Sequence, residues 1–452
     1  MPLGQRSATS EATSLVVVGG GLAGCEAAFQ AASRGCAVTL YEMRPMTTSA
    51  AHQGGDLAEL VCSNSLRGAS LTNAVGLLKE EMHRMGSLVH RAAKATAVPA
   101  GRALAVDRLA FSQYITQAIE THPRIEVVRE RVDSLPTAPL AILATGPLTS
   151  PAMAAEVQAL LGEASLYFYD AIAPTVYADS IDYEVVFRAS RYEDGEGDYL
   201  NVPLYRGGYE RFVDELVAAE PLPLHASEAA LYFEGCLPIE EMARRGRDTL
   251  AYGPMKPVGL TDPKTGRRPH GVVQLRQEDK AGILYNLVGF QTRLRIPEQR
   301  RLFRSLPGLG EAVFARYGSV HRNTFINAPE HLSPSLELRC RPGLYIAGQM
   351  AGVEGYVESA ALGLLAGINA AFAARGETAP EVPAETAHGA LLRHLGHCER
   401  GDFQPSNVNY GLFLPLQDAP RRLPRREKVS RFAERAFGAL EDWKTRVGGV
   451  PA

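Results

Sequence analysis

Two cysteines in this 452-residue chain lie where a thiol could act as a nucleophile. One is Cys236, in the stretch YFEGCLPIEEMARRG, where Gly235 and Pro238 frame a predicted turn. The thiolate is the reactive form of cysteine, and partial exposure and nearby positive charge favour it. Glu234 opposes ionisation unless it accepts the proton. Three basic residues follow within a few helical turns: Arg244, Arg245 and Arg247.

The other is Cys62, in LVCSNSLRG, where Ser63, Asn64 and Ser65 offer hydrogen-bond donors at a predicted helix start. Amides at a helix start stabilise a negative charge, so this thiol is also a candidate nucleophile. Free cysteines are more often small buried hydrophobic residues. That interpretation stays open for both candidates, and we adopt it for the remaining four: Cys25, Cys36, Cys340 and Cys398.

A glycine loop near the N-terminus indicates a second chemistry, the binding of a dinucleotide. Its G-x-G-x-x-G pattern follows a predicted strand and opens a predicted helix, which is the context that this pattern requires. The first glycine permits the tight turn, the second lets a pyrophosphate approach the backbone, and the third lets helix and strand pack closely. An acidic residue at the end of the next strand can bind a ribose hydroxyl and disfavours a 2′-phosphate. The predicted cofactor-binding residues here are Gly19, Gly20, Gly21, Leu22, Ala23, Gly24 and Glu42.

The C-terminal part repeats this texture in LYIAGQMAGVEGYVESAALGLLAG, again a strand, a glycine turn and a helix of small residues. A second helix start of this kind favours FAD over NAD, because a two-part FAD domain brings it to the flavin end. We therefore expect Gly348, Gln349 and Tyr356 to bind the cofactor, with Tyr356 near the ring system. The alternative for Tyr356 is a half-buried core tyrosine.

These sites need an α/β framework to position them. Apolar periodicity predicts a strand over 15–18, a helix over 22–33, a strand over 38–42 and one amphipathic helix over 71–90. Gly/Pro punctuation and many arginines set apart the middle of the chain. We predict a discontinuous nucleotide-binding domain, 1–190 and 330–452, interrupted by an insertion domain, 191–329. A basic stretch broken by proline and a helix of about a dozen residues are expected near the end.

Composition places few limits on function. The chain has 46% hydrophobic and 21% charged residues and a net charge of −3, so any nucleic-acid binding requires a local basic surface. The six cysteines form no CxxC pair and no metal-ligand spacing, which indicates reduced thiols, no metal site and a cytoplasmic protein. No apolar run is expected to reach the roughly 18 to 20 residues that span a bilayer.

Several strings together resemble one family. They are VVVGGGLAGCEAA, ELVCSNSLRG, YFEGCLPIEEMA, KPVGL, VVQLRQED, LVGFQTRL, RNTFINAP and IAGQMAGVEGYVESAALG. The chain is identified through them as similar, from about residue 14 to beyond Phe413, to the folate- and FAD-dependent tRNA (uracil-5-)-methyltransferases, TrmFO. It departs from the expected strings in a longer N-terminal leader and in RLRI at 293–296.

The resemblance implies a Rossmann-type FAD domain, like that of glutathione reductase, with a mixed α+β insertion. It implies methylation of C5 of the T-loop uridine at tRNA position 54, with 5,10-methylenetetrahydrofolate as carbon donor and FAD reduced by NADH or NADPH. The family's two catalytic cysteines match Cys62 and Cys236. We expect Cys236 to add to uracil C6, which makes C5 nucleophilic, and Cys62 to lie beside the flavin.

Such an enzyme must neutralise tRNA phosphates. The sequence has four basic concentrations, RRGR, KTGRRPH, RLRIPEQRRLFR and RRLPRREKVSR, which begin at residues 244, 264, 293 and 421. The alternative for each is a solvated arginine face. The predicted RNA-binding residues are Arg244, Arg245, Arg247, Arg293 and Arg295.

Three rival functions remain open at this point. One is the related flavoprotein that modifies the wobble uridine, of the MnmG (GidA) type, which normally carries a long C-terminal helical domain. Another is an FAD/NAD(P)H oxidoreductase that does not act on RNA; a disulfide reductase of this class needs a close cysteine pair. The third is a flavin-stabilised RNA-binding protein without turnover.

Overall fold

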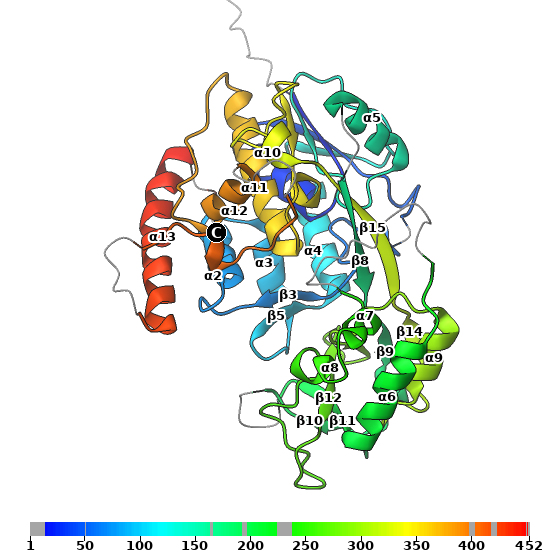
Figure 1. Ribbon diagram of the computed structural model, residues 1–452. Coiled ribbons are helices and arrows are strands. Elements are labelled where there is room, and N and C mark those ends of the chain that lie inside the picture. Colours follow the sequence, from blue (N-terminus) through cyan, green and yellow to red (C-terminus); the bar gives the residue numbers. More distant parts are fainter. Residues whose placement is uncertain are drawn as a thin grey trace, which may run out of the picture.

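The computed structural model describes residues 14–49, 51–162, 166–191, 197–223, 237–396, 403–416, 423–448 and 450. Figure 1 shows two units. The larger, the parallel unit, contains both described ends of the chain, and the smaller, the antiparallel unit, is built from its middle.

The parallel unit is organised around a five-stranded parallel sheet. Its strand order is β16-β7-β1-β2-β6. Leu15 and Val17 of the central strand are fully buried, as expected of a parallel strand covered on both faces. Because β16 pairs with β7, the sheet combines both ends of the chain, which confirms the expected discontinuous arrangement. The strands are β1 (Ser14–Val18), β2 (Ala37–Tyr41), β6 (Ile125–Val128), β7 (Ala141–Leu143) and β16 (Leu344–Ile346).

Two helices from opposite ends of the chain cross at unusually short range. They are α1 (Leu22–Ser33) and α11 (Tyr356–Ala373). A Cβ atom on Gly363 would lie 2.2 Å from the carbonyl oxygen of Ala23, and one on Gly367 would lie 2.4 Å from that of Ala27. Only glycine allows this approach.

Helix α11 is also long and apolar enough to cross a membrane by length and composition, with a mean hydropathy of 1.3 over 18 residues. This finding corrects the expectation that no such stretch exists. However, 78% of that window is buried inside the protein, so α11 is packed as a core helix.

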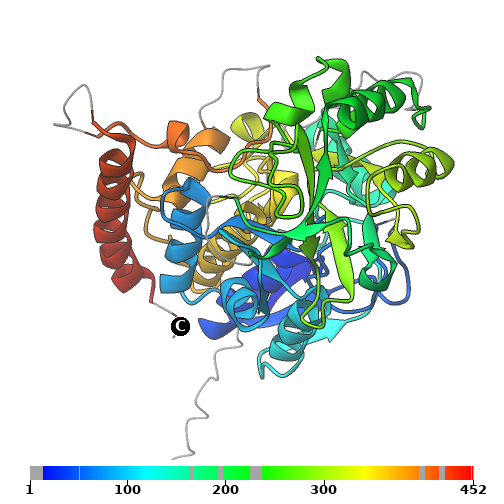
Figure 2. The same ribbon diagram turned by 90° about the horizontal axis from the view of Figure 1, so that it is seen from below.

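The remaining helices of the parallel unit cover the sheet and its flank. The predicted helix over 71–90 is two helices, because Gly86 adopts φ +73° and a Cβ there would lie 2.4 Å from the carbonyl oxygen of Val450. The predicted short C-terminal helix has 23 residues and lies beside α2 (Figures 1 and 2). The elements are α2 (Ala74–Arg84), α3 (Leu88–Ala95), α4 (Arg108–Glu120), α5 (Pro151–Leu161), α10 (Ala328–His331), η3 (Gly348–Ala351), α12 (Ala387–Gly396), η4 (Tyr410–Leu412) and α13 (Arg425–Val447).

A small antiparallel sheet and a long strand pair lie between the two units. The small sheet has the order β3-β5-β4, and β8 pairs with β15 along its whole length. The strands are β3 (Ser65–Gly68), β4 (Ala97–Val98), β5 (Ala103–Val106), β8 (Leu166–Ile172) and β15 (Ser319–Phe325).

The antiparallel unit has a six-stranded sheet in the order β10-β11-β12-β13-β9-β14. Its buried cluster extends from Val176 to Ala312, whereas the sequence placed the insertion at 191–329. The division into domains stays a prediction. The elements are β9 (Thr175–Tyr177), η1 (Ala178–Ser180), β10 (Phe187–Arg188), β11 (Tyr199–Leu204), α6 (Arg206–Ala218), α7 (Ile239–Arg244), α8 (Thr249–Tyr252), β12 (Gly271–Gln277), β13 (Leu284–Leu287), α9 (Ile296–Arg304) and β14 (Phe314–Arg316).

Candidate active site

A cleft opens at the carboxyl ends of the parallel strands. Segments that follow β1, β2, β6, β7 and β16 line it, and this edge is where open α/β sheets bind ligands. Eight of the predicted cofactor-binding residues line the cleft: Gly19, Gly21, Leu22, Ala23, Glu42, Gly348, Gln349 and Tyr356. The other two, Gly20 and Gly24, lie behind it in the packing of the loop.

The glycine loop leaves space where a phosphate group would lie. Gly19 has φ +105°, and a Cβ there would lie 2.4 Å from the carbonyl oxygen of Ala144. A Cβ on Gly24 would lie 1.8 Å from the carbonyl oxygen of Gly19, so this glycine sets the contact between helix and strand. A Cβ on Gly21, in contrast, would meet nothing within 4 Å. Helix α1 begins there without a side-chain cap, so its first amides are available to an anion.

Glu42 follows β2 and is only 5% exposed. Its carboxylate accepts hydrogen bonds from the Gly20 amide at 2.8 Å and from the Arg44 Nε at 2.8 Å. Burial alone would raise the pKa of Glu42, but the hydrogen bonds and charge of Arg44 outweigh it and hold the pKa below its ordinary value. Glu42 is therefore a fixed anion at the wall of the cleft.

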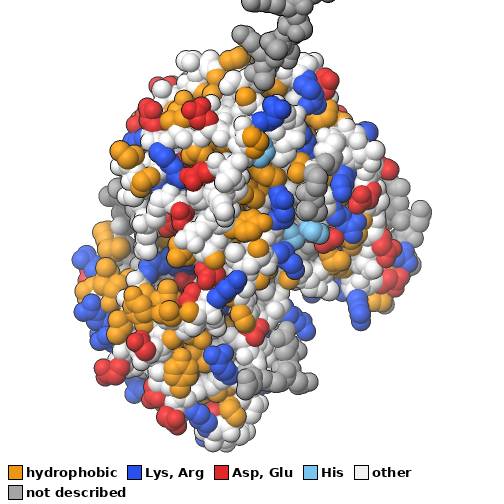
Figure 3. All heavy atoms as spheres, turned by 180° about the vertical axis from the view of Figure 1, so that it is seen from behind, with side chains coloured by type: hydrophobic (Ala, Val, Ile, Leu, Met, Phe, Trp, Pro, Cys, Tyr) orange, Lys and Arg blue, Asp and Glu red, His pale blue; other side chains and the backbone are white. Residues whose placement is uncertain are grey.

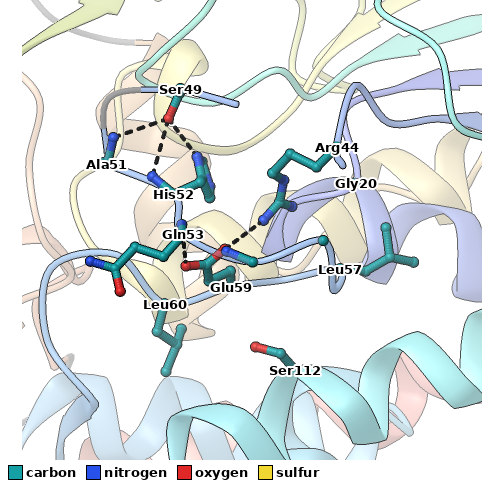
Figure 4. A network of polar contacts seen from close by, with 12 residues as sticks. Gly20, Arg44, Ser49, Ala51, His52, Gln53, Leu57, Glu59, Leu60 and Ser112 are labelled. Carbon is teal, nitrogen blue, oxygen red and sulfur yellow. Dashed lines mark hydrogen bonds and ion pairs between the residues drawn. The ribbon is translucent and has the colours of Figure 1, made fainter. Parts of the chain in front are cut away.

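The segment after Glu42 forms a polar wall of the cleft (Figure 4). Glu59 lies between the Arg44 guanidinium, at 3.0 Å, and the backbone amide of Gln53, at 2.9 Å. Nearby, Ser49 Oγ lies 2.6 Å from His52 Nδ1. His52 and Glu59 both line the cleft, yet no sequence pattern singled them out.

Cys62 lies beside Tyr356, which lines the cleft. Its backbone amide donates a 2.7 Å hydrogen bond to the Tyr356 hydroxyl oxygen, and the Ser63 amide donates one of 3.2 Å. The side chain of Cys62 is half-buried. It precedes strand β3 rather than a helix, so the predicted activation by a helix start is wrong. Burial raises the pKa of Tyr356, which keeps the phenol neutral.

Arginines take the place of the expected helix amides around Cys62. Arg108 of α4 and Arg316 of β14 both donate hydrogen bonds to the Cys62 carbonyl oxygen, at 3.3 and 3.5 Å. Arg276 of β12 donates a 2.7 Å hydrogen bond to the Ser63 hydroxyl. Since Arg276 and Arg316 come from the antiparallel unit, both units build the surroundings of this thiol.

Glu278 balances this positive charge. Its carboxylate pairs with Arg108 at 2.7 Å and lies 4.0 Å from Arg316. Burial would raise the pKa of Glu278, but the charges of Arg108 and Arg316 outweigh it and lower the pKa. The Nε atoms of both arginines have no hydrogen-bond partner among the described residues, so each retains a donor.

Sequence reasoning missed this ionic cluster. Arg276 and Glu278 do lie in VVQLRQED, one of the strings that carried the family resemblance, but nothing in the string gave them a role. No pattern marked Arg108 or Arg316, which are far from Cys62 in the sequence.

Cys236 lies outside the described residues, as does Glu234. The described chain resumes at Leu237, and the segment that follows is firmly attached. Ile239 donates a backbone hydrogen bond of 2.7 Å to Gln291. The buried Glu240 carboxylate accepts from the Thr292 hydroxyl at 2.8 Å and from the Arg293 amide at 2.9 Å.

Four of the five predicted RNA-binding arginines are paired with acids. Arg244 and Arg293 share Glu241, at 2.8 and 2.7 Å. Arg247 pairs with Asp214 at 2.5 Å, and Arg295 pairs with Glu220 at 3.0 Å. Arg245 directly follows α7.

The rear face of the antiparallel unit, at the lower left of Figure 3, gathers hydrophobic side chains. The exposed large hydrophobic residues of the antiparallel unit include Ile283, Ile296 and Val313. The structure thus brings the cofactor residues together around one cleft, whereas the predicted RNA-binding arginines are spread over an ion-paired surface. Within the described ranges, no group of three or more His, Cys, Asp or Glu side chains is arranged to hold a metal ion.

Known proteins match this chain over most of its length. Residues 14–378 match the family model described as GIDA, glucose inhibited division protein A. The methylenetetrahydrofolate–tRNA-(uracil-5-)-methyltransferase TrmFO of Geobacter sulfurreducens is 58% identical over 96% of this chain and 99% of its own length. The protein of the same name from Heliobacterium modesticaldum is 55% identical over 94% of this chain and 97% of its own length.

The solved structures of GidA from Aquifex aeolicus have the same fold. The form II crystal structure superposes with a TM-score of 0.67 at 17% identity and covers 96% of this chain but 75% of the GidA chain. The form I crystal structure gives a TM-score of 0.67 at 18% identity. This likeness concerns the fold alone.

Proposed function

The chain belongs to the TrmFO family, and from that premise we propose that it methylates C5 of the T-loop uridine at tRNA position 54. It is a folate-dependent tRNA uracil-5-methyltransferase, since relatives of that name are 55% to 58% identical over nearly its full length. The T-loop position, the roles of individual residues and the cytoplasmic location are our proposal.

One observation carries the proposal. The Tyr356 hydroxyl accepts the hydrogen bond of the Cys62 amide, and Tyr356 also lines the nucleotide cleft. This contact holds a half-buried thiol next to the nucleotide cleft, among arginines of both units. A domain that only binds NAD does not need a thiol at this position.

The cleft fits FAD. The open space at Gly21 and the uncapped start of α1 suit a pyrophosphate, and Glu42 suits a ribose hydroxyl. Gly348 and Gln349 of η3 and Tyr356 at the start of α11 supply a second wall, where the flavin end belongs. When bound and reduced by NADH or NADPH, FAD supplies the hydride that converts a methylene unit into a methyl group.

One of the protein's own thiols, that of Cys236, acts on the uracil. Cys236 adds through Sγ to C6, the C5–C6 double bond opens and C5 becomes nucleophilic. After C5 has bonded to the one-carbon unit, a base removes its proton and the Sγ–C6 bond breaks, which restores the ring. Cys62 is held beside the cofactor by the hydrogen bond of its amide to Tyr356 and by those of its carbonyl oxygen with Arg108 and Arg316.

An isotope experiment tests the proposed reaction. Unmodified tRNA is incubated with NADPH, FAD and methylenetetrahydrofolate labelled in its methylene carbon, and the nucleosides are analysed by mass spectrometry. Labelled 5-methyluridine at position 54 is expected from the wild type and not from Cys62→Ala or Cys236→Ala. The control is Cys340→Ala, because Cys340 is exposed and away from the cleft. If 5-methyluridine is labelled only when the label is supplied in S-adenosylmethionine instead, the proposal is contradicted.

The rivals are less well supported. The wobble-uridine flavoproteins share the fold, but the GidA structure is 17% identical to this chain whereas the TrmFO relative is 58% identical. Modification at position 34 rather than 54 in the same experiment would favour that rival. Flavin reduction that is unaffected by Cys62→Ala, without any tRNA product, would favour an oxidoreductase that does not act on RNA.

A further inference from the structure

A second hollow lies between the start of α2 and the start of α13. We call it the α2–α13 groove. Its walls include Arg67, Asn73, Tyr410, Arg425, Lys428 and Phe432. Figures 1 and 2 both show α13 standing beside α2, on the flank of the parallel unit.

The groove is positively charged, and two of its cations have no acidic partner among the described residues. Arg425 and Lys428 lie on the first turn of α13 and are exposed. Their neighbour Arg431, in contrast, pairs with Glu427 at 2.7 Å. The arginines predicted from the sequence to bind RNA are mostly neutralised by acids, so these two cations are better suited to bind an anion.

Backbone and aromatic groups complete the groove. Asn73 caps α2 without a side-chain hydrogen bond, and the first residues of the helix line the groove with their amides uncapped. The Tyr410 ring stacks on Phe432 with a centroid distance of 5.4 Å and an interplanar angle of 16°. Lys428 Nζ lies 5.8 Å from the Phe432 ring. Phe432 is buried, so the half-buried Tyr410 ring is the aromatic group that faces the groove, and cations beside an aromatic ring are a common surface for single-stranded nucleic acid.

The groove is connected to the candidate active site by direct contacts. Arg67, which lines the groove, pairs with Glu358 in the first turn of α11 and donates a 2.7 Å hydrogen bond to Asn407. Helix α11 begins at Tyr356, the residue that holds Cys62. An anion in the groove therefore lies next to the element that carries the reaction.

We propose that the α2–α13 groove binds phosphate groups of the tRNA substrate close to the target uridine. The proposal rests on the proposed function. A carboxylate of the folate glutamate tail is also an anion that these cations could bind. The experiment below distinguishes binding of tRNA from binding of folate. The exposed positions of Arg425 and Lys428 favour the polyanion.

The test compares two double variants with equal loss of charge. Arg425→Ala/Lys428→Ala removes the two groove cations that have no acidic partner in the described chain, and Lys444→Ala/Arg446→Ala removes two cations from the last turn of the same helix. For the groove variant, the Kd for tRNA should rise about tenfold, and the slope of log K against log salt should fall by about 0.7 to 0.9 for each phosphate that is no longer neutralised. The control variant should leave both unchanged.

Kinetics distinguish the sources of the anion. The groove variant should raise the KM for tRNA and leave kcat at saturating tRNA, tRNA-independent NADPH oxidation and the KM for methylenetetrahydrofolate unchanged. Arg425→Lys should retain wild-type tRNA binding, because it keeps the charge. Unchanged tRNA affinity and salt slope, or a change in the folate KM alone, would overturn the proposal. Failure of the proposed function is seen separately, as a wild-type protein that binds tRNA without methylating it.

Discussion

The amide of Cys62 and the hydroxyl of Tyr356 are joined by a 2.7 Å hydrogen bond across 294 residues of sequence. This contact connects the segment before β3 to the first residue of α11. It also explains why a tyrosine is suitable at this position, since its hydroxyl oxygen accepts from two successive amides.

Tyr356→Phe should lower the methylation rate. The substitution leaves the amides of Cys62 and Ser63 without their acceptor, which costs about 1 to 3 kcal/mol and loosens the thiol. Single-turnover methylation and thermal unfolding measure the two effects. Tyr114→Phe, on the exposed side of α4, is the control. A variant with the wild-type methylation rate would show that the contact does not position Cys62.

Glu278→Gln should destabilise the junction between the two units. It leaves Arg108 and Arg316 without their counter-charge, and loss of one partner of a buried ion pair costs about 3 kcal/mol or more. Denaturant unfolding at pH 7 measures this cost, with Glu311→Gln as an exposed control.

The same residue should affect the dependence of stability on pH. The pKa of Glu278 is lowered in the folded protein, so its contribution to stability is complete above the unfolded value of about 4.3 and is lost as the pH falls through the lowered folded value. Below about pH 4, the wild-type unfolding free energy should therefore decrease more steeply than that of Glu278→Gln. Parallel curves in this range would contradict the assignment.

Alanine at two glycines should separate cofactor binding from folding. Gly21→Ala places its methyl group in open space at the cleft, so it should fold normally but bind FAD about tenfold or more weakly, a loss of about 1.4 kcal/mol. Gly24→Ala drives a methyl group against the carbonyl oxygen of Gly19 and should lower the unfolding free energy by about 1 to 3 kcal/mol. Flavin titration and thermal unfolding measure these effects. Gly438→Ala, exposed on α13, is the control for both and should change neither adversely.

Glu240→Ala should slow methylation without loss of flavin. Burial raises the pKa of Glu240, and its carboxylate fixes the segment after Cys236 through Thr292 and the Arg293 amide. We expect normal FAD content and NADPH oxidation with a reduced methylation rate. Glu241→Ala, at the neighbouring and more exposed position, is the control. Equal rates in both variants would argue against a positioning role for Glu240.

Local patterns in the sequence were sufficient for much of the fold and the cleft. The helix predicted over 22–33 coincides with α1, and the glycine loop, Glu42 and the start of α11 lie around one cavity. These features are encoded by neighbouring residues, whose spacing follows directly from strand and helix periods.

Contacts between residues that are far apart in the sequence could not be predicted from local patterns. Arg108, Glu278 and Arg316 meet only after the two units have packed, and an ion pair leaves no periodic trace in the sequence. The C-terminal helix was underestimated for a different reason. Pro424 is the N-cap residue of α13. The basic residues after it therefore form the first turns of the helix and not a separate stretch before it.

The close crossing of α1 and α11 also imposes an order on biosynthesis. Helix α1 is among the first segments to leave the ribosome, yet its alanine face has no partner until the glycines at 363 and 367 have been translated. Flavin capture is consequently a late event for the nascent chain, and a product that terminates before Tyr356 lacks α11 together with the two cleft residues that it supplies, Tyr356 and Ser359.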